Sequence, residues 1–384
     1  GVHEVTAFRG THPWVLYLLP LAGFVIVSFY KLTETDGLGT DDIIDAVHEG
    51  KRLPILLLPA IFFGTVLTHL CGGSAGREGA ALQMGGTIGQ CMGRTFRLDD
   101  RDLRVATLAG MAAFFSALFG TPLAATVFAI MVISIGVLYH VALYPSLLAA
   151  LVAYGVSVRL GVEPTRFTVA VPDQSVGMFV RVAALGVLCA LVSILFCKLM
   201  HGAGHLMKRI KNPWLRVICG GFAVIALTWV FGTDYNGAGM VIVTRAIEQE
   251  TVAVPWAFLL KLVFTAVTLA AGFKGGEVVP SFFVGATFGC AVSPLLGLPV
   301  GFGAAVGLAA VFCGVTNCPV ASTLLAVELF GAEGMLYFAL ACCLSYMLSG
   351  YQGLYSSQTI LYSKLKAQFI NVHTNAYHAG EKTE

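Results

Sequence analysis

Charge is scarce in this 384-residue chain, because only 11% of its residues are Asp, Glu, Lys or Arg. A soluble domain has roughly 25% charged residues, so this chain has too few to cover a water-facing surface of its size. Hydrophobic residues make up 57% of the sequence, and the net charge is only +2. No basic run with interleaved aromatics occurs, so nucleic-acid binding is not expected. The composition predicts a multi-pass protein of the cell inner membrane or plasma membrane, surrounded by the lipid bilayer.

Motifs for metal binding, disulfide bonding and intramembrane catalysis are also missing. The ten cysteines are scattered among apolar residues without CxxC or Cys/His ligand spacing, so we predict buried free thiols. His201 and His205 are four residues apart, but no carboxylate or cysteine is near them in sequence, and we expect surface histidines. H-E-x-x-H is absent, and membrane-depth histidines such as His69 and His140 stand alone, which leaves an intramembrane enzyme as a remote alternative. We expect no metal and no cofactor.

Apolar stretches predict the membrane spans, each of which needs about 20 residues. Clear candidates for single spans are Trp14 to Tyr30, Leu53 to Leu70, Met178 to Met200, Trp214 to Phe231, and Pro255 to Ala271. Two longer regions, 105–157 and 282–349, are interrupted by Gly and Pro. They predict tilted or broken helices inside a bundle, because non-helical backbone at membrane depth must be covered by protein or line an aqueous cavity.

Loop charges suggest an orientation for these spans. Lys and Arg gather within 94–104 and within 208–216, and such clusters favour the cytoplasmic face. We expect a single transport domain over residues 1–364, with a first half at about 14–165 and a second half at about 176–364. Residues 365–384 are expected to form a short cytoplasmic tail.

The two halves of the chain resemble each other at a nearly constant offset. With a shift of 200 residues the stretch around Gly76 meets the stretch around Gly276, and Val278 falls on Glu78. With a shift of 197, "TPLAATVFAI" meets "CPVASTLLAV". Interrupted segments in matching halves are typical of transporters with a substrate site at the repeat interface. We therefore predict an all-α polytopic membrane protein with an internal repeat, acting as a secondary transporter or as a channel derived from one.

Three glycine-rich stretches each lead into a predicted helix start. Residues 37–39, "GLG", precede a helix that we expect Thr40 or Asp41 to cap. "SAGREGAALQMGG" predicts a helix starting near Glu78, and "GGEVVPSFF" predicts another with Pro280 in its first turn. Helix N-termini expose unpaired N–H groups and a positive dipole end. Three of them converging in a dry interior would bind a small anion without a Lys or Arg touching it.

The motifs "GSAGREG", "GGEVVP" and a late "GLYSSQ" occur in this order, and from Asp36 to Lys364 the chain resembles the CLC family of anion channels and anion/proton antiporters. The resemblance implies a homodimer in which each subunit has its own pathway for an anion and for protons. It also implies that each subunit is an inverted-topology repeat, built from two halves of opposite membrane orientation with many tilted and broken helices. It implies that Glu78 is the gating glutamate, which competes with the anion and carries the proton. The implied anion-binding residues are Gly37, Leu38, Gly39, Gly76, Arg77, Gly79, Val278, Val279 and Tyr355.

Departures from the chloride-type motifs point to one branch of this family. Chloride-type members usually show Gly-Ser-Gly-Ile-Pro, Gly-Arg/Lys-Glu-Gly-Pro and Gly-x-Phe-x-Pro, where this chain has "GLGTD", "GREGA" and "GEVVP". Leu38, Ala80 and Val278 at these positions are similar to the bacterial fluoride/proton antiporter branch, although Val279 and Met131 differ from its usual Thr and Glu. The resemblance implies fluoride export coupled to proton antiport. A chloride/proton exchanger or a passive anion channel of the same family is the alternative.

The inner end of the proton route is a separate question. Chloride-type exchangers place a glutamate at the position that matches Val132, and valine cannot titrate. Glu277, beside the proposed anion site, is the only acidic residue in its stretch. Our hypothesis is that Glu277 supports anion or proton movement, with a structural role as the alternative.

Structural explanations compete for several of these residues. Arg77 could neutralise Glu78, but a carboxylate at membrane depth costs about 2.5–3.5 kcal/mol, and adjacent helical residues point in different directions. Function is therefore the better explanation for Glu78. Tyr355 could be an interfacial anchor, and Leu38 could be core packing. Glu328, in "AVELFG", could be a buried hydrogen-bonded residue, and we assign it no role in transport.

Overall fold

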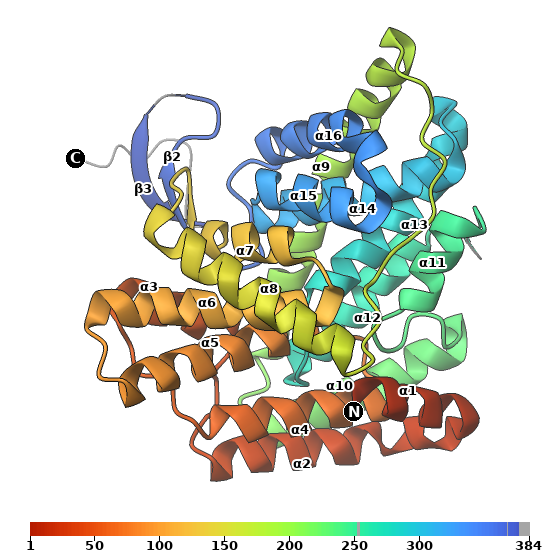
Figure 1. Ribbon diagram of the computed structural model, residues 1–384. Coiled ribbons are helices and arrows are strands. Elements are labelled where there is room, and N and C mark those ends of the chain that lie inside the picture. The colour runs from red at the N-terminus through yellow and green to blue at the C-terminus, as the bar shows by residue number, and fades with distance from the viewer. Residues whose placement is uncertain (252–253, 367, 376–384) are drawn as a thin grey trace.

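The computed structural model describes residues 1–251, 254–366 and 368–375 of the chain, and Figure 1 shows a bundle of helices with a small sheet at one end. The helices of the first half are α1 (Val2–Thr11), α2 (Leu19–Leu32), α3 (Thr40–Glu49), α4 (Leu57–Leu70), α5 (Glu78–Thr95), α6 (Asp100–Phe119), α7 (Pro122–Met131) and α8 (Leu143–Arg159). Those of the second half are α9 (Val176–Met207), α10 (Pro213–Phe231), α11 (Met240–Glu248), α12 (Ala257–Ala271), α13 (Val278–Leu296), α14 (Val300–Thr316), α15 (Pro319–Phe330) and α16 (Met335–Leu348).

Three of the five predicted single spans, Trp14 to Tyr30, Met178 to Met200 and Trp214 to Phe231, fall on helical segments that are long and apolar enough to cross a membrane. The other two fall on the shorter helices α4 and α12, of 14 and 15 residues, and the two interrupted regions are broken as expected. Within the described residues six helical segments are long and apolar enough to cross a membrane. Region 105–157 contains most of α6, all of α7 and most of α8, and region 282–349 contains most of α13 and all of α14 to α16. Several of these helices are only 10–17 residues long, so they end inside the bundle, where other helices cover their ends.

Equivalent glycines hold equivalent helix pairs together in the two halves. A Cβ added to Gly85 of α5 would lie 2.3 Å from the carbonyl oxygen of Gly110 in α6. A Cβ added to Gly285 of α13 would lie 2.4 Å from the carbonyl oxygen of Gly307 in α14. These contacts repeat with the offsets of 200 and 197 that the sequence shows, so both matched blocks belong to one structural repeat.

The two halves meet through their matched glycines. The N–H of Gly76 donates to the carbonyl of Gly276, and the N–H of Gly276 donates back to the carbonyl of Gly76, both at 2.7 Å. This isolated antiparallel bridge joins two residues that are 200 positions apart. A reciprocal pair between equivalent residues is what a two-fold relation between the halves produces, and it places the starts of α5 and α13 next to each other.

Glu328 of α15 is a structural residue, as expected. Its carboxylate oxygens accept hydrogen bonds from the N–H groups of Leu123 at 3.1 Å and Ala124 at 2.8 Å. These N–H groups belong to the first turn of α7, where they have no partner within the helix. Glu328 therefore caps the equivalent helix of the other half. All ten cysteines are free and seven are buried, but Cys91 is half-buried and Cys219 and Cys343 are exposed, so the prediction of buried thiols is wrong for these three.

The end of the chain differs from the expected polar tail. Residues 367 and 376–384 of the predicted tail, 365–384, lie outside the described residues, but β3 (Phe369–His373) pairs with β2 (Thr359–Tyr362), which pairs with β1 (Ser134–Ile135). Ile135, Ile360 and Ile370 form a small apolar cluster of their own. The sheet ties this segment to the end of α7, and its strands are too short to have been predicted from alternation alone.

Candidate functional site

The starts of α5 and α13 hold the Glu78 carboxylate. Glu78 is 1% exposed, and its Oε2 accepts a hydrogen bond of 3.4 Å from the N–H of Val279 in the first turn of α13. Its Oε1 has no hydrogen-bond partner among the described residues. The carboxylate therefore occupies the position at a helix N-terminus that an anion would take.

Glycine is required around this carboxylate because backbone passes against backbone. A Cβ on Gly79 would lie 2.9 Å from the Cα of Gly276, and a Cβ on Gly76 would lie 2.1 Å from Oε2 of Glu78. Val278, fully buried, follows the same bridge in the second half. The structure thus brings the predicted residues Gly76, Gly79, Val278 and Val279 to one place around Glu78.

A first cavity, which we name the Tyr355 cavity, has a volume of about 270 Å³. It gathers five of the residues singled out in the sequence, which are Gly37, Leu38, Gly39, Glu277 and Tyr355. A neighbouring cavity of about 500 Å³ shares Asp41 and Glu277 with it and is also lined by His201 and His205. Glu277 therefore lines both the Tyr355 cavity and the larger neighbouring cavity.

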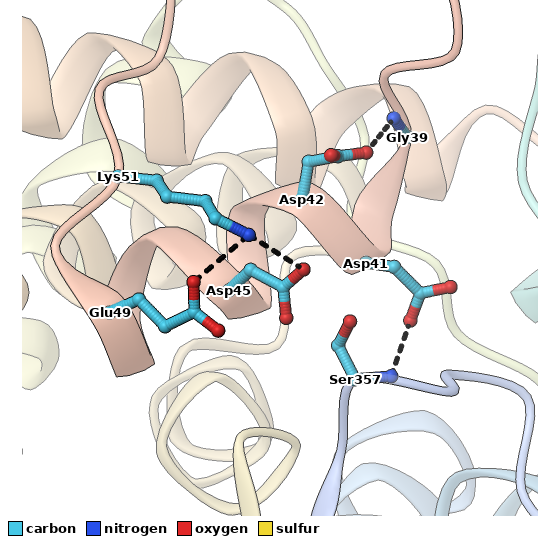
Figure 2. A network of polar contacts seen from close by, with 7 residues as sticks. All are labelled: Gly39, Asp41, Asp42, Asp45, Glu49, Lys51 and Ser357. Carbon is cyan, nitrogen blue, oxygen red and sulfur yellow. Dashed lines mark hydrogen bonds and ion pairs between the residues drawn. The ribbon is translucent and has the colours of Figure 1, made fainter.

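The start of α3 differs from expectation, because neither Thr40 nor Asp41 caps it. The N-cap is Gly39, whose N–H donates to the carboxylate of Asp42 at 2.8 Å (Figure 2). The N–H of Leu38 donates to the carbonyl of Thr35 at 3.2 Å. An anion at this helix start must therefore compete with Asp42, a tethered carboxylate three residues further along the chain.

Asp41 has another contact, to the loop that carries Tyr355. Its Oδ1 accepts a hydrogen bond of 3.0 Å from the N–H of Ser357 (Figure 2). This bond joins the first turn of α3 to the segment that follows Tyr355, so it fixes two walls of the Tyr355 cavity against each other. Sequence reasoning did not assign this role to Asp41, and a contact between residues 41 and 357 leaves no local signal.

A second cavity, which we name the Glu78 cavity, has a volume of about 460 Å³. Arg77, Glu78 and Val279 line it, together with the segment around Gly239. None of the residues that line the Tyr355 cavity lines this one. The predicted anion-binding set is thus divided between two cavities, with Arg77 on the Glu78 side and Leu38 and Tyr355 on the other.

Several residues that line these cavities were missed in the sequence, and one had a visible signal. Lys274 lies in the Tyr355 cavity with its Nζ over the Tyr30 ring, 4.1 Å from the ring centroid. The segment "GAG", 237–239, matches "GLG", 37–39, at the offset of 200 that the repeat already shows. Extending the comparison at this offset back to residue 37 would have identified a fourth helix start, that of α11.

The position of the missing inner glutamate is closed. Val132 is fully buried, and Met131, at the end of α7, packs against the same apolar core. Neither side chain can exchange a proton, so a proton route through this part of the structure would have to use other groups.

Comparison with known proteins decides the family. The chain matches the family described as "Voltage gated chloride channel" over residues 20–350. The chain belongs to the CLC family. Members of this family are channels and antiporters, so the chain is an anion-transport protein and not an enzyme.

Individual CLC proteins are similar over nearly the whole chain. A "Chloride/fluoride channel protein" of Pseudomonas syringae pv. tomato is 40% identical over 376 residues, which cover 95% of this chain and 82% of that protein. The crystal structure of a CLC-type fluoride/proton antiporter superposes with a TM-score of 0.90 at 33% identity, covering 94% of this chain and 92% of the other. A slow cyanobacterial Cl⁻/H⁺ antiporter shares the fold, with a TM-score of 0.73 at 20% identity over 91% of this chain and 88% of the other.

Proposed function

We propose that this CLC protein exports fluoride in exchange for protons, with Glu78 as the gate. The observation that carries the proposal is the position of the Glu78 carboxylate at the start of α13, where it accepts the Val279 N–H. The names of the 40% identical channel protein and of the superposed antiporter support fluoride as the anion. Leu38, Ala80 and Val278 support the same branch through the motifs of the sequence.

The geometry suggests how the exchange works. Deprotonated Glu78 takes the place of an anion at the paired helix starts, where N–H groups and two dipole ends favour negative charge. Once protonated, the carboxyl loses this attraction and leaves the position to fluoride, which N–H donors then bind at short range. Each cycle moves a proton on Glu78 in one direction and an anion in the other, because the Glu78 carboxylate and the anion compete for one position.

Flux measurements in liposomes test this function. Vesicles loaded with fluoride or with chloride should release fluoride and take up protons in a fixed ratio, with little release of chloride. Equal efflux of both ions would favour the chloride/proton exchanger, and fluoride efflux without proton movement would favour a passive channel. Either result would overturn fluoride/proton antiport.

We further propose that Glu277 passes protons between the Tyr355 cavity and the helix starts. Glu277 lines both the Tyr355 cavity and the neighbouring cavity with His201 and His205, whereas Val132 is buried and cannot titrate.

Replacing Glu277 by glutamine is expected to lower the number of protons moved per fluoride by about tenfold, while fluoride efflux continues. The physical reason is that glutamine keeps the shape of the side chain but cannot carry a proton. Simultaneous recordings of a fluoride electrode and a pH electrode on the same vesicles give this ratio. Unchanged rate and unchanged coupling in the Glu277→Gln protein would assign Glu277 a structural role.

We propose that the protein is a homodimer in the bacterial inner or plasma membrane. Apolar side chains such as Leu148 on α8, Val320 on α15 and Leu336 on α16 are exposed, and only lipid or a second copy can cover them in a membrane. The protein mass of the detergent-solubilised complex, measured by light scattering, distinguishes one copy from two.

A further inference from the structure

The segment 237–239 repeats the "GLG" loop on the opposite side of the Gly76–Gly276 bridge. Gly237 and Gly239 both have positive φ, 62° and 79°, and α11 begins directly after them at Met240. Ala238, Gly239 and Met240 line the Glu78 cavity. The start of α11 is therefore open to the cavity that contains the Glu78 carboxylate.

The first turn of α11 lacks the carboxylates that occupy the first turn of α3. Asp42 caps Gly39 in the first half, and the equivalent residue in the second half is Ile242. Asp41 is likewise replaced by Val241, and no side chain caps α11. Within the described part of the chain, no hydrogen bond satisfies the N–H groups of Ala238, Gly239 and Met240.

Carbonyl groups of the same loop are turned towards a buried cation. Nζ of Lys261, a fully buried side chain, donates to the carbonyls of Tyr235 at 3.0 Å and Gly237. Both carbonyls are therefore directed towards the Lys261 ammonium, while the N–H groups of residues 238–240 have no partner among the described residues. Two further cations, Arg9 and Arg245, line the cavity, and neither forms an ion pair with another described residue.

His69 is an independent indication that this cavity receives a ligand. The side chain is fully buried and lines the Glu78 cavity. Its Nδ1 bonds to the Thr65 carbonyl at 2.8 Å, as the donor, while Nε2 has no partner among the described residues. Nε2 is therefore the ring nitrogen that remains for a ligand, and it donates to an anion only when it carries a proton.

We propose that the start of α11, with Arg9 and His69, binds a second small inorganic anion in the Glu78 cavity. This position is separate from the one that Glu78 occupies at α13. The ligand is a monovalent, halide-sized ion, because uncapped N–H groups and cations without ion-pair partners among the described residues line this cavity. The proposal rests on the proposed anion transport only for the identity of the ion, which would wait here between solution and the Glu78 gate.

The charges that face this cavity are mostly positive. They come from α1, α4, the start of α5, the loop before α11 and α11 itself, and the residues are His3, Arg9, His69, Arg77, Glu78, Asp234 and Arg245. When Glu78 is deprotonated it opposes an anion nearby, and when it is protonated it does not. The second site is therefore expected to fill more readily while Glu78 carries its proton.

Bromide, which scatters anomalously, is a suitable probe for the site. Crystals of the full chain grown in bromide should show an anomalous peak within hydrogen-bond reach of the Ala238–Val241 backbone, apart from Val279. The substitution Val241→Asp places a carboxylate in the first turn of α11, where Asp41 lies in α3. Because this negative charge repels an anion at the helix start, we expect the peak to be lost. Val241 is 72% exposed, so the substitution leaves the core intact.

Val241→Asn is the matched control, because it has the same shape without the charge, and it should keep the peak. A wild-type crystal without the peak, a peak that persists in Val241→Asp, or a peak lost equally in Val241→Asn would each overturn the second site. Bromide binding is measured without transport. If fluoride/proton exchange fails in vesicles, the bromide result still stands. If the bromide peak is absent, the exchange measured in vesicles still stands.

Discussion

Glu78→Gln is expected to stop proton movement while fluoride continues to cross the membrane. Glutamine has the size of the protonated carboxyl but cannot release a proton, so the position at α13 is never occupied by a negative side chain. The proton-to-fluoride ratio in proteoliposomes should fall to the leak of protein-free vesicles. The effect should be large because the Glu78 carboxylate and the anion compete for one position, and the proton is carried on that carboxylate.

Glu328→Gln provides the control at similar depth in the bundle. Its carboxylate caps α7 through the N–H groups of Leu123 and Ala124, and charged capping bonds of this kind contribute about 1.5–3 kcal/mol. We therefore expect a lower midpoint of thermal unfolding but an unchanged proton-to-fluoride ratio. Proton exchange that survives in Glu78→Gln would contradict the gating role.

Gly276→Ala is expected to disrupt the interface between the two halves. The added Cβ would lie 2.4 Å from the backbone nitrogen of Gly79, and no rotamer change can move a backbone atom away. Overpacking in a filled core costs about 1–3 kcal/mol, and this clash also breaks the reciprocal hydrogen bonds with Gly76. We expect a large drop in the midpoint of thermal unfolding, measured by fluorescence-detected size exclusion. We also expect loss of fluoride flux.

Gly202→Ala is the matched control for this substitution. Gly202 lies in α9 and is exposed, with no atom within 4 Å of an added Cβ. Alanine favours a helix over glycine by about 1 kcal/mol, so the midpoint should stay the same or rise slightly. Equal midpoints for Gly276→Ala and the wild type would show that the halves are not held at the glycine bridge.

Some of the site could be predicted because its signal is local. The starts of α5 and α13 follow from glycine-rich approaches to apolar runs. The first begins at Glu78 as predicted, and the second has Pro280 in its first turn as predicted. Capping of α3 was predicted wrongly, because Thr40 and Asp41 are good caps by type, whereas the bend at Gly39 brings Asp42 to the free N–H instead.

The sequence alone determined the class of the protein, its duplication and its gating candidate. Because charge is scarce, the chain requires a lipid environment. Because two separate blocks match at nearly the same offset, the chain contains a structural repeat. Only the tertiary structure decided which helix starts are occupied and which are open. Asp42 fills the start of α3, Glu78 lies at the start of α13, and among the described residues no side chain caps α11. The contact between Glu78 and Val279 joins residues 201 positions apart, so it depends on packing across the repeat and not on local preference.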